Sequence, residues 1–128
     1  MLRISREGLR ATLSQLHSEA PNEGVGLWVG KKGRVTQVIP LPNTHPRPSS
    51  AYNAEPEALI HAVQGLEREG LELLAIYHSH PKGPARPSQT DKTQAFWRVP
   101  YVIFALETGE WRAYKLPEGE EVMVNVEG

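Results

Sequence analysis

The chain of 128 residues contains no cysteine. This absence excludes disulfides, a thiolate nucleophile and any zinc site that is held by thiolates. A metal ion bound by this protein must therefore use histidine, aspartate, glutamate and water as ligands.

An excess of charge of either sign is also lacking, because 14 Lys and Arg residues stand against 15 Asp and Glu residues, for a formal net charge of −1. This balance gives no electrostatic argument for binding nucleic acid or an anionic membrane. The longest apolar run, Val99 to Leu106, is far too short to span a bilayer. The first seven residues lack the apolar core of a signal peptide. We therefore expect a cytoplasmic protein with neither a nucleic-acid nor a membrane partner.

The length suits one domain, which we expect to cover residues 1–128. Ser5 is a suitable cap for a helix that ends at Pro21, and Pro56 suits the first turn of a second helix that ends near Glu69. A short helix beginning at Ser88 is expected to contain Ala95, Phe96 and Trp97. Residues 40–55, rich in Pro, Ser and Asn, are expected to form a loop. Strands are expected at residues 26–29, 35–39, 71–77, 99–106, 111–116 and, as a last edge strand, 121–126.

These elements predict an α/β fold with a mixed, largely antiparallel sheet that is flanked by helices. The segment 71–77 is almost entirely apolar, which is typical of a central strand that is buried on both faces.

Two histidines two residues apart, His78 and His80, follow this apolar segment. On an extended strand they point to the same side. Asp91 lies eleven residues beyond His80 and can fold back to meet them. Two nitrogen ligands and one oxygen ligand, with a fourth position left for water, make up a typical catalytic zinc site. Zinc lowers the pKa of a bound water to about 7, which makes hydroxide available for hydrolysis.

Hydrolysis at such a site also needs a proton carrier and a group that stabilises the oxyanion. Glu23 is a candidate for the first role, because the small residues of Gly24-Val25-Gly26 leave room for a substrate beside it. Ser88 offers a hydroxyl near the metal ligands for the second role.

The spacing of these residues resembles the signature of the JAMM (MPN-plus) metalloprotease family. That signature is an upstream Glu, then His-x-His-Pro, then Ser and, after two more residues, Asp. Here seven residues separate His80 from Ser88, and two separate Ser88 from Asp91. The family usually carries a Cys, which is not a catalytic group, where Val25 stands. The resemblance covers most of the chain.

The resemblance implies an MPN/cytidine-deaminase-like architecture and a Zn²⁺ cofactor bound by His78, His80 and Asp91. It implies that Glu23 is the acid/base and that Ser88 stabilises the oxyanion. Short prokaryotic members of the family are associated with small ubiquitin-like, sulfur-carrier proteins that end in Gly-Gly. The implied activity is therefore a zinc-dependent peptidase or isopeptidase that hydrolyses amide bonds at the C-terminal tail of such a partner or of its conjugates.

Other interpretations of the same residues stay open. Ser88 and Asp91 alone fit the start of a helix, and an isolated pair of histidines fits a polar strand end. A Ser-His-Asp triad using Ser79 is disfavoured, because Ser79 does not lie in a Gly-x-Ser-x-Gly turn.

Two alternative functions also follow from the sequence. One is a non-catalytic binding or scaffold module on the same fold. The other is a zinc hydrolase that releases an amino acid from a small carrier protein.

Overall fold

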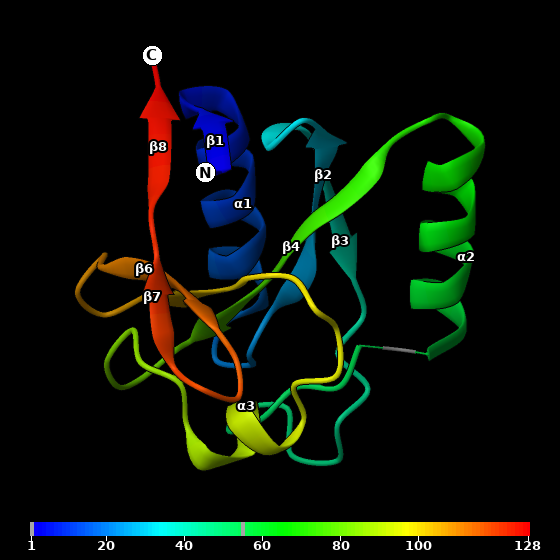
Figure 1. Ribbon diagram of the computed structural model, residues 1–128. Coiled ribbons are helices and arrows are strands. Elements are labelled where there is room, and N and C mark those ends of the chain that lie inside the picture. Colours follow the sequence, from blue (N-terminus) through cyan, green and yellow to red (C-terminus); the bar gives the residue numbers. More distant parts are fainter. Residues whose placement is uncertain (1, 55) are drawn as a thin grey trace.

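The computed structural model describes residues 2–54 and 56–128, so Met1 of the N-terminal segment and Glu55 of the expected loop lie outside the described residues. Three helices and eight strands follow one another along the described chain (Figure 1). Their order is β1 (Leu2–Ser5), α1 (Arg6–Glu19), β2 (Val25–Lys31), β3 (Arg34–Leu41), α2 (Pro56–Arg68), β4 (Glu72–His80), α3 (Gln89–Thr93), β5 (Tyr101–Ala105), β6 (Trp111–Lys115), β7 (Glu120–Val122) and β8 (Val124–Glu127).

The strands form one sheet in the order β7-β6-β5-β4-β2-β3-β1-β8. Strand β4 is central, antiparallel to β2 and parallel to β5. Four of the seven strand pairs are antiparallel and three are parallel, so the expected mixed sheet is confirmed. The interior of β4 is buried from Leu74 to His80, as expected for a central strand.

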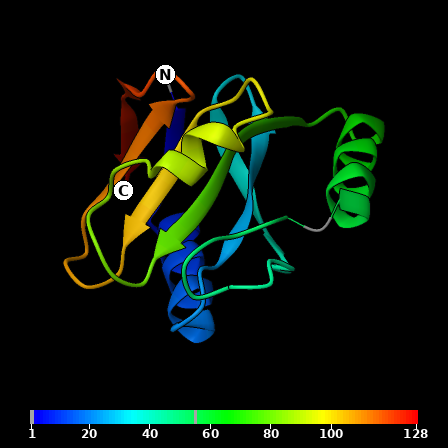
Figure 2. The ribbon, with the colours of Figure 1, turned by 90° about the horizontal axis from the view of Figure 1, so that it is seen from below.

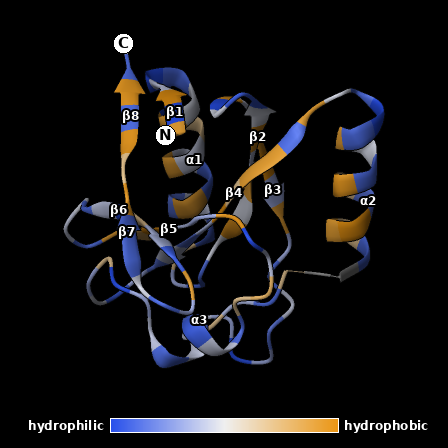
Figure 3. Cartoon of the chain, viewed as in Figure 1, coloured by the Kyte–Doolittle hydropathy of each residue, from blue (hydrophilic) through white to orange (hydrophobic). Residues whose placement is uncertain are grey.

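Each face of the sheet carries its own apolar core because successive side chains of a strand point to opposite faces. Tyr77 of β4 packs with Leu16 of α1 on one face, whereas Ile76 packs with Leu66 of α2 on the other. Figure 2 shows α1 and α2 as separate flanking elements on either side of the strands, and Figure 3 shows the apolar stripe of α2 turned toward the sheet.

The two longer helices agree with the sequence prediction. Helix α1 begins after Ser5, whose side chain accepts a hydrogen bond from the Gly8 amide at 3.0 Å. Helix α2 is followed by Gly70 in a left-handed conformation with φ of 72°. Within the described residues, no helix combines the length and the hydrophobicity needed to cross a membrane.

Three local predictions were wrong. The helix after Ser88 ends at Thr93, so Ala95, Phe96 and Trp97 lie outside it. The strand expected from Val99 starts only after Pro100, which has no amide hydrogen for a strand pair. The single edge strand expected over 121–126 is two strands, β7 and β8, which lie at opposite ends of the sheet order although only Met123 separates them.

Candidate metal centre

The C-terminal end of β4 carries His78 and His80 on the same face as Ile76. The two histidines lie within the strand itself, which extends to His80, rather than after it. His78 is fully buried, and His80 is 9% exposed. The central position of β4, with a neighbouring strand on each side, therefore gives both imidazoles a rigid support.

Helix α3 brings Asp91 to the histidines. The Ser88 hydroxyl accepts a hydrogen bond from the Asp91 amide at 3.0 Å, and the Ser88 amide donates to Asp91 Oδ2 at 2.8 Å. This reciprocal pair is a capping box, so the helix-start interpretation of Ser88 and Asp91 is correct. The cap also orients the carboxylate of Asp91 toward the histidines, so one local motif serves both purposes.

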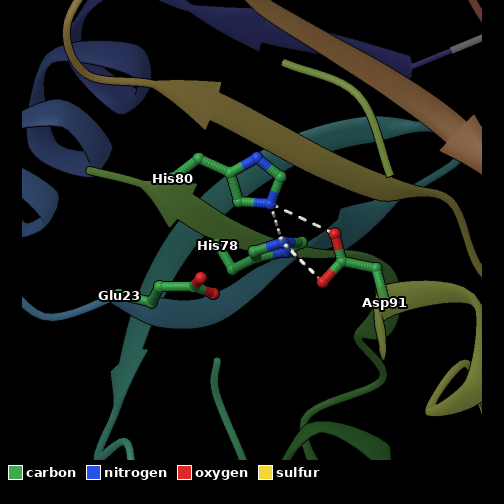
Figure 4. Close-up of side chains that lie close together, drawn as sticks. All are labelled: Glu23, His78, His80 and Asp91. Carbon is green, nitrogen blue, oxygen red and sulfur yellow. Dashed lines mark hydrogen bonds and ion pairs between the residues drawn. The ribbon is translucent and has the colours of Figure 1, made fainter. Parts of the chain in front are cut away.

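Three side chains converge on one point (Figure 4). His78 Nε2 lies 3.2 Å from Asp91 Oδ1, and His80 Nε2 lies 3.1 Å from Asp91 Oδ2. The two Nε2 atoms are 3.2 Å apart. Ligand atoms about 2.1 Å from a tetrahedral zinc ion lie roughly 3.4 Å from one another, which is close to the contacts between the two Nε2 atoms and from each Nε2 to one oxygen of Asp91.

The tautomer of His80 supports a cation at this point. His80 Nδ1 lies 2.9 Å from the carbonyl oxygen of Pro84 and must donate its hydrogen to it. In the neutral ring Nε2 then carries a lone pair that faces the other two ligand atoms. In this tautomer His80 Nε2 and Asp91 Oδ2 are both electron-pair donors 3.1 Å apart, a contact that a metal ion between them would satisfy.

The electrostatics of Asp91 and His78 agree with this interpretation. Burial raises the pKa of Asp91, but the hydrogen bonds with His78 and His80 outweigh it and hold that pKa far below its usual range. Burial lowers the pKa of His78, which keeps the ring neutral. An ionised carboxylate and a neutral imidazole are the forms that bind zinc. For His80, burial lowers the pKa, but the hydrogen bonds with Asp91 and with the Pro84 carbonyl outweigh it and raise that pKa.

Glu23 lies in the turn before β2 and joins the same cluster. One ligand-capable atom from each of Glu23, His78, His80 and Asp91 lies within 4.8 Å of the others. Burial raises the pKa of Glu23 to about 7; His80 opposes this rise and Asp91 adds to it. Glu23 Oε1 is buried without a hydrogen-bond partner among the described residues.

A cavity of about 890 Å³ opens at this cluster. Glu23, His80 and Ser88 line it, together with residues of the segment 81–87 and with Ser49 and Ser50. The structure thus brings all five predicted site residues to one place. Among the described residues, His17, His45 and His61 do not belong to the ligand cluster.

Three contributors to the site were missed by the sequence analysis. Tyr52 stacks on His78 with ring centroids 4.4 Å apart. Ser79, which is fully buried, accepts a hydrogen bond from the Gly24 amide at 2.8 Å and so holds the residue next to Glu23. Asn43 binds the carbonyl oxygen of Glu23 at 2.9 Å. No spacing rule connects these residues with the histidines. The only available signal was Asn43, since an Asn in a Pro-rich loop is typical of a structured turn.

The sequence model of a family described as prokaryotic homologs of the JAB domain (Prok-JAB) matches residues 5–117. The chain belongs to this family. Its resemblance to the JAMM proteins is thereby confirmed.

Two curated relatives have names that describe an activity. A Thermus thermophilus protein named "Probable TtuB-protein conjugate cleaving protease" is 58% identical over 126 residues, covering 98% of this chain and 83% of the relative. A Pyrococcus furiosus protein named "Desampylase" is 33% identical over 120 residues, covering 93% and 84%. Among solved structures, one described as "JAMM: A Metalloprotease-like Zinc Site in the Proteasome and Signalosome" superposes with a TM-score of 0.65 at 23% identity, covering 100% of this chain and 99% of that one. This last likeness supports the fold alone.

Proposed function

We propose that this protein is a zinc-dependent isopeptidase that hydrolyses the amide bond at the C-terminal tail of a small ubiquitin-like protein or of its conjugates. The observation that carries the proposal is the convergence of His78 Nε2, His80 Nε2 and the Asp91 carboxylate, with contacts of 3.1–3.2 Å, beside a buried carboxylate with a raised pKa. A carboxyl whose pKa is near neutral both accepts and returns a proton efficiently.

In this proposal His78, His80 and Asp91 hold the zinc ion. When bound, the ion would supply a water molecule of lowered pKa and would polarise the scissile carbonyl group. Glu23 accepts a proton from the attacking water and then donates it to the leaving amine. The Ser88 hydroxyl accepts from the Asp91 amide through its oxygen, which leaves its own hydrogen free to donate to the oxyanion.

The substrate class is inferred from the relatives and is consistent with the cavity. The name of the Thermus thermophilus relative refers to protein conjugates, and that relative is 58% identical to this chain. Glu23 and His80 of the metal-ligand cluster line the cavity, so a peptide tail that entered it would reach the proposed metal site.

A cleavage assay tests the proposal. The substrate is a small ubiquitin-like protein ending in Gly-Gly that is joined to a lysine side chain, and intact-mass spectrometry reads the products. Wild-type protein loaded with zinc should release the carrier with a free C-terminal carboxylate. Glu23→Gln should keep its zinc and lose cleavage. The exposed Glu69→Gln serves as the matched control and should retain full activity. Cleavage that survives complete removal of zinc would contradict the proposal.

A further inference from the structure

Asn43 makes more side-chain hydrogen bonds than its place in a loop requires. Its Nδ2 group donates to the carbonyl oxygens of Glu23 at 2.9 Å and Ala51 at 3.0 Å, with Pro48 at 3.4 Å. Its Oδ1 accepts hydrogen bonds from the amides of His45 and Asn53, both at 3.0 Å. Every donor and acceptor of this amide is therefore in use, and the partners lie on two separate segments of the chain.

One of these partners is the backbone of Glu23. The Glu23 amide donates to the Pro48 carbonyl at 2.6 Å, while the Glu23 carbonyl accepts from Asn43. On its other side, Gly24 is held by Ser79 of β4 through two hydrogen bonds of 2.8 and 3.0 Å. Glu23 is thus fixed between the central strand and the loop that Asn43 organises.

The side chain of Glu23 has no comparable support. Within residues 2–54 and 56–128 its carboxylate accepts no hydrogen bond, and Oε1 is buried. The position of the carboxylate therefore depends on the backbone that carries it. The segments that carry the metal ligands, β4 and α3, make no hydrogen bond with the Asn43 side chain.

We propose that Asn43 is a positioning residue that sets the place of the Glu23 carboxylate in the site, and that it acts on turnover and not on metal binding. This inference rests on the proposed function for its kinetic readout. Loss of the Asn43 donor frees the Glu23 carbonyl and loosens the segment 44–53. The carboxylate then shifts relative to the attacking water. His78 and His80 stay on the central strand β4 and Asp91 stays on the capped helix α3, although Tyr52 of the loosened segment stacks on the His78 ring. Misplacement by about 1 Å can cost roughly a hundredfold in rate.

Asn43→Asp tests the inference most directly. It keeps the shape of the side chain and its Oδ1 atom, but it replaces the Nδ2 donor with an oxygen acceptor that faces three carbonyl oxygens. We expect kcat to fall by about ten- to a hundredfold, with KM within about twofold and one zinc ion still bound per chain. Asn53→Ala is the matched control in the same loop, since the exposed Asn53 contributes only its backbone to Asn43. This control should keep the wild-type kcat.

Hydrogen exchange gives a readout that is independent of activity. In Asn43→Asp, the Glu23 amide, which donates to the Pro48 carbonyl of the loosened segment, should exchange at least about tenfold faster, while the amides of residues 76–78 should not change. If Asn43→Asp does not fold, Asn43→Ala, which lacks the repulsion between carboxylate and carbonyls, is judged by the same measurements.

The inference would be overturned if the variant kept the wild-type kcat, or if hydrogen exchange at the Glu23 amide did not change. It would also be overturned if kcat fell only in proportion to a loss of bound zinc. A wild-type protein that cleaves no conjugate would instead refute the proposed function. The exchange experiment would then still decide whether Asn43 holds Glu23.

Discussion

The raised pKa of Glu23 makes the stability of the zinc-free protein depend on pH, and Glu23→Gln should remove that dependence. The pKa rises from its ordinary value of 4.5 to about 7, first because of burial and further because of Asp91, with His80 opposing. The folded protein therefore binds this proton more tightly than the unfolded chain does. The contribution of Glu23 to the free energy of unfolding therefore falls as pH increases from 4.5 to about 7, and the full loss is present above 7.

The size of the effect follows from the shift. At about 1.4 kcal/mol per pKa unit, the upper limit is roughly 3 kcal/mol. Because Glu23 lines an open cavity, solvent screens part of its charge, and we expect about 1–2 kcal/mol. Urea unfolding at pH 5 and pH 8, in the presence of a chelator, measures this quantity.

The comparison between variants isolates Glu23 from the other titrating groups. The stability of Glu23→Gln relative to wild type should rise by about 1–2 kcal/mol between the two pH values. The exposed Glu69→Gln should follow wild type at both. Identical pH dependence in wild type and Glu23→Gln would show that the Glu23 carboxyl titrates normally, and the argument for its role as a near-neutral proton carrier would fail.

Three further predictions concern the ligands, the cap and the packing. His80→Ala should lose zinc and activity together, as measured by metal analysis, and a variant with normal zinc content would contradict the ligand assignment. Ser88→Ala should reduce kcat about a hundredfold and lower the free energy of unfolding by about 1 kcal/mol, because it loses both the oxyanion donor and the helix cap. Gly26→Ala should lower the free energy of unfolding by about 1–3 kcal/mol, as measured with urea, because the new Cβ would lie 2.7 Å from the Ile39 carbonyl oxygen and would collide with the Tyr77 hydroxyl. Gly65→Ala is the contrasting substitution. Its new Cβ would have nothing within 4 Å, so it should stabilise helix α2 slightly.

The arrangement of His78, His80 and Asp91 was predictable in part from local rules, whereas Glu23, which lies far from them in the sequence, was assigned to the site by the family resemblance. Alternation along a strand places His78 and His80 on one side, and the capping preference of Ser88 fixes Asp91 in the first turn of a helix. Both rules operate over a few residues and do not depend on the rest of the fold.

The support around the site was not predictable, because it depends on contacts across the chain. Tyr52 stacks on a ring 26 positions later in the sequence, and Asn43 binds a carbonyl 20 positions earlier. The division of the C-terminal segment into β7 and β8 has the same origin, since β6 pairs with one and β1 with the other. Neither partner is indicated by the alternation of residues 121–126.

The placement of β7 and β8 has a consequence for self-association. Because β7 and β8 are the edges of the sheet, removal of residues 120–128 would move the edges to β6 and β1. The three-residue edge strand β7, which carries Glu120 and Glu121, would then be replaced by the five-residue strand β6. Exposed edges are templates for pairing with other chains, and a molecule with two of them can extend in both directions. Because short, charged edge strands resist such pairing, a protein that lacks residues 120–128 should self-associate more readily than one that retains them, although the metal-ligand cluster lies several strands away.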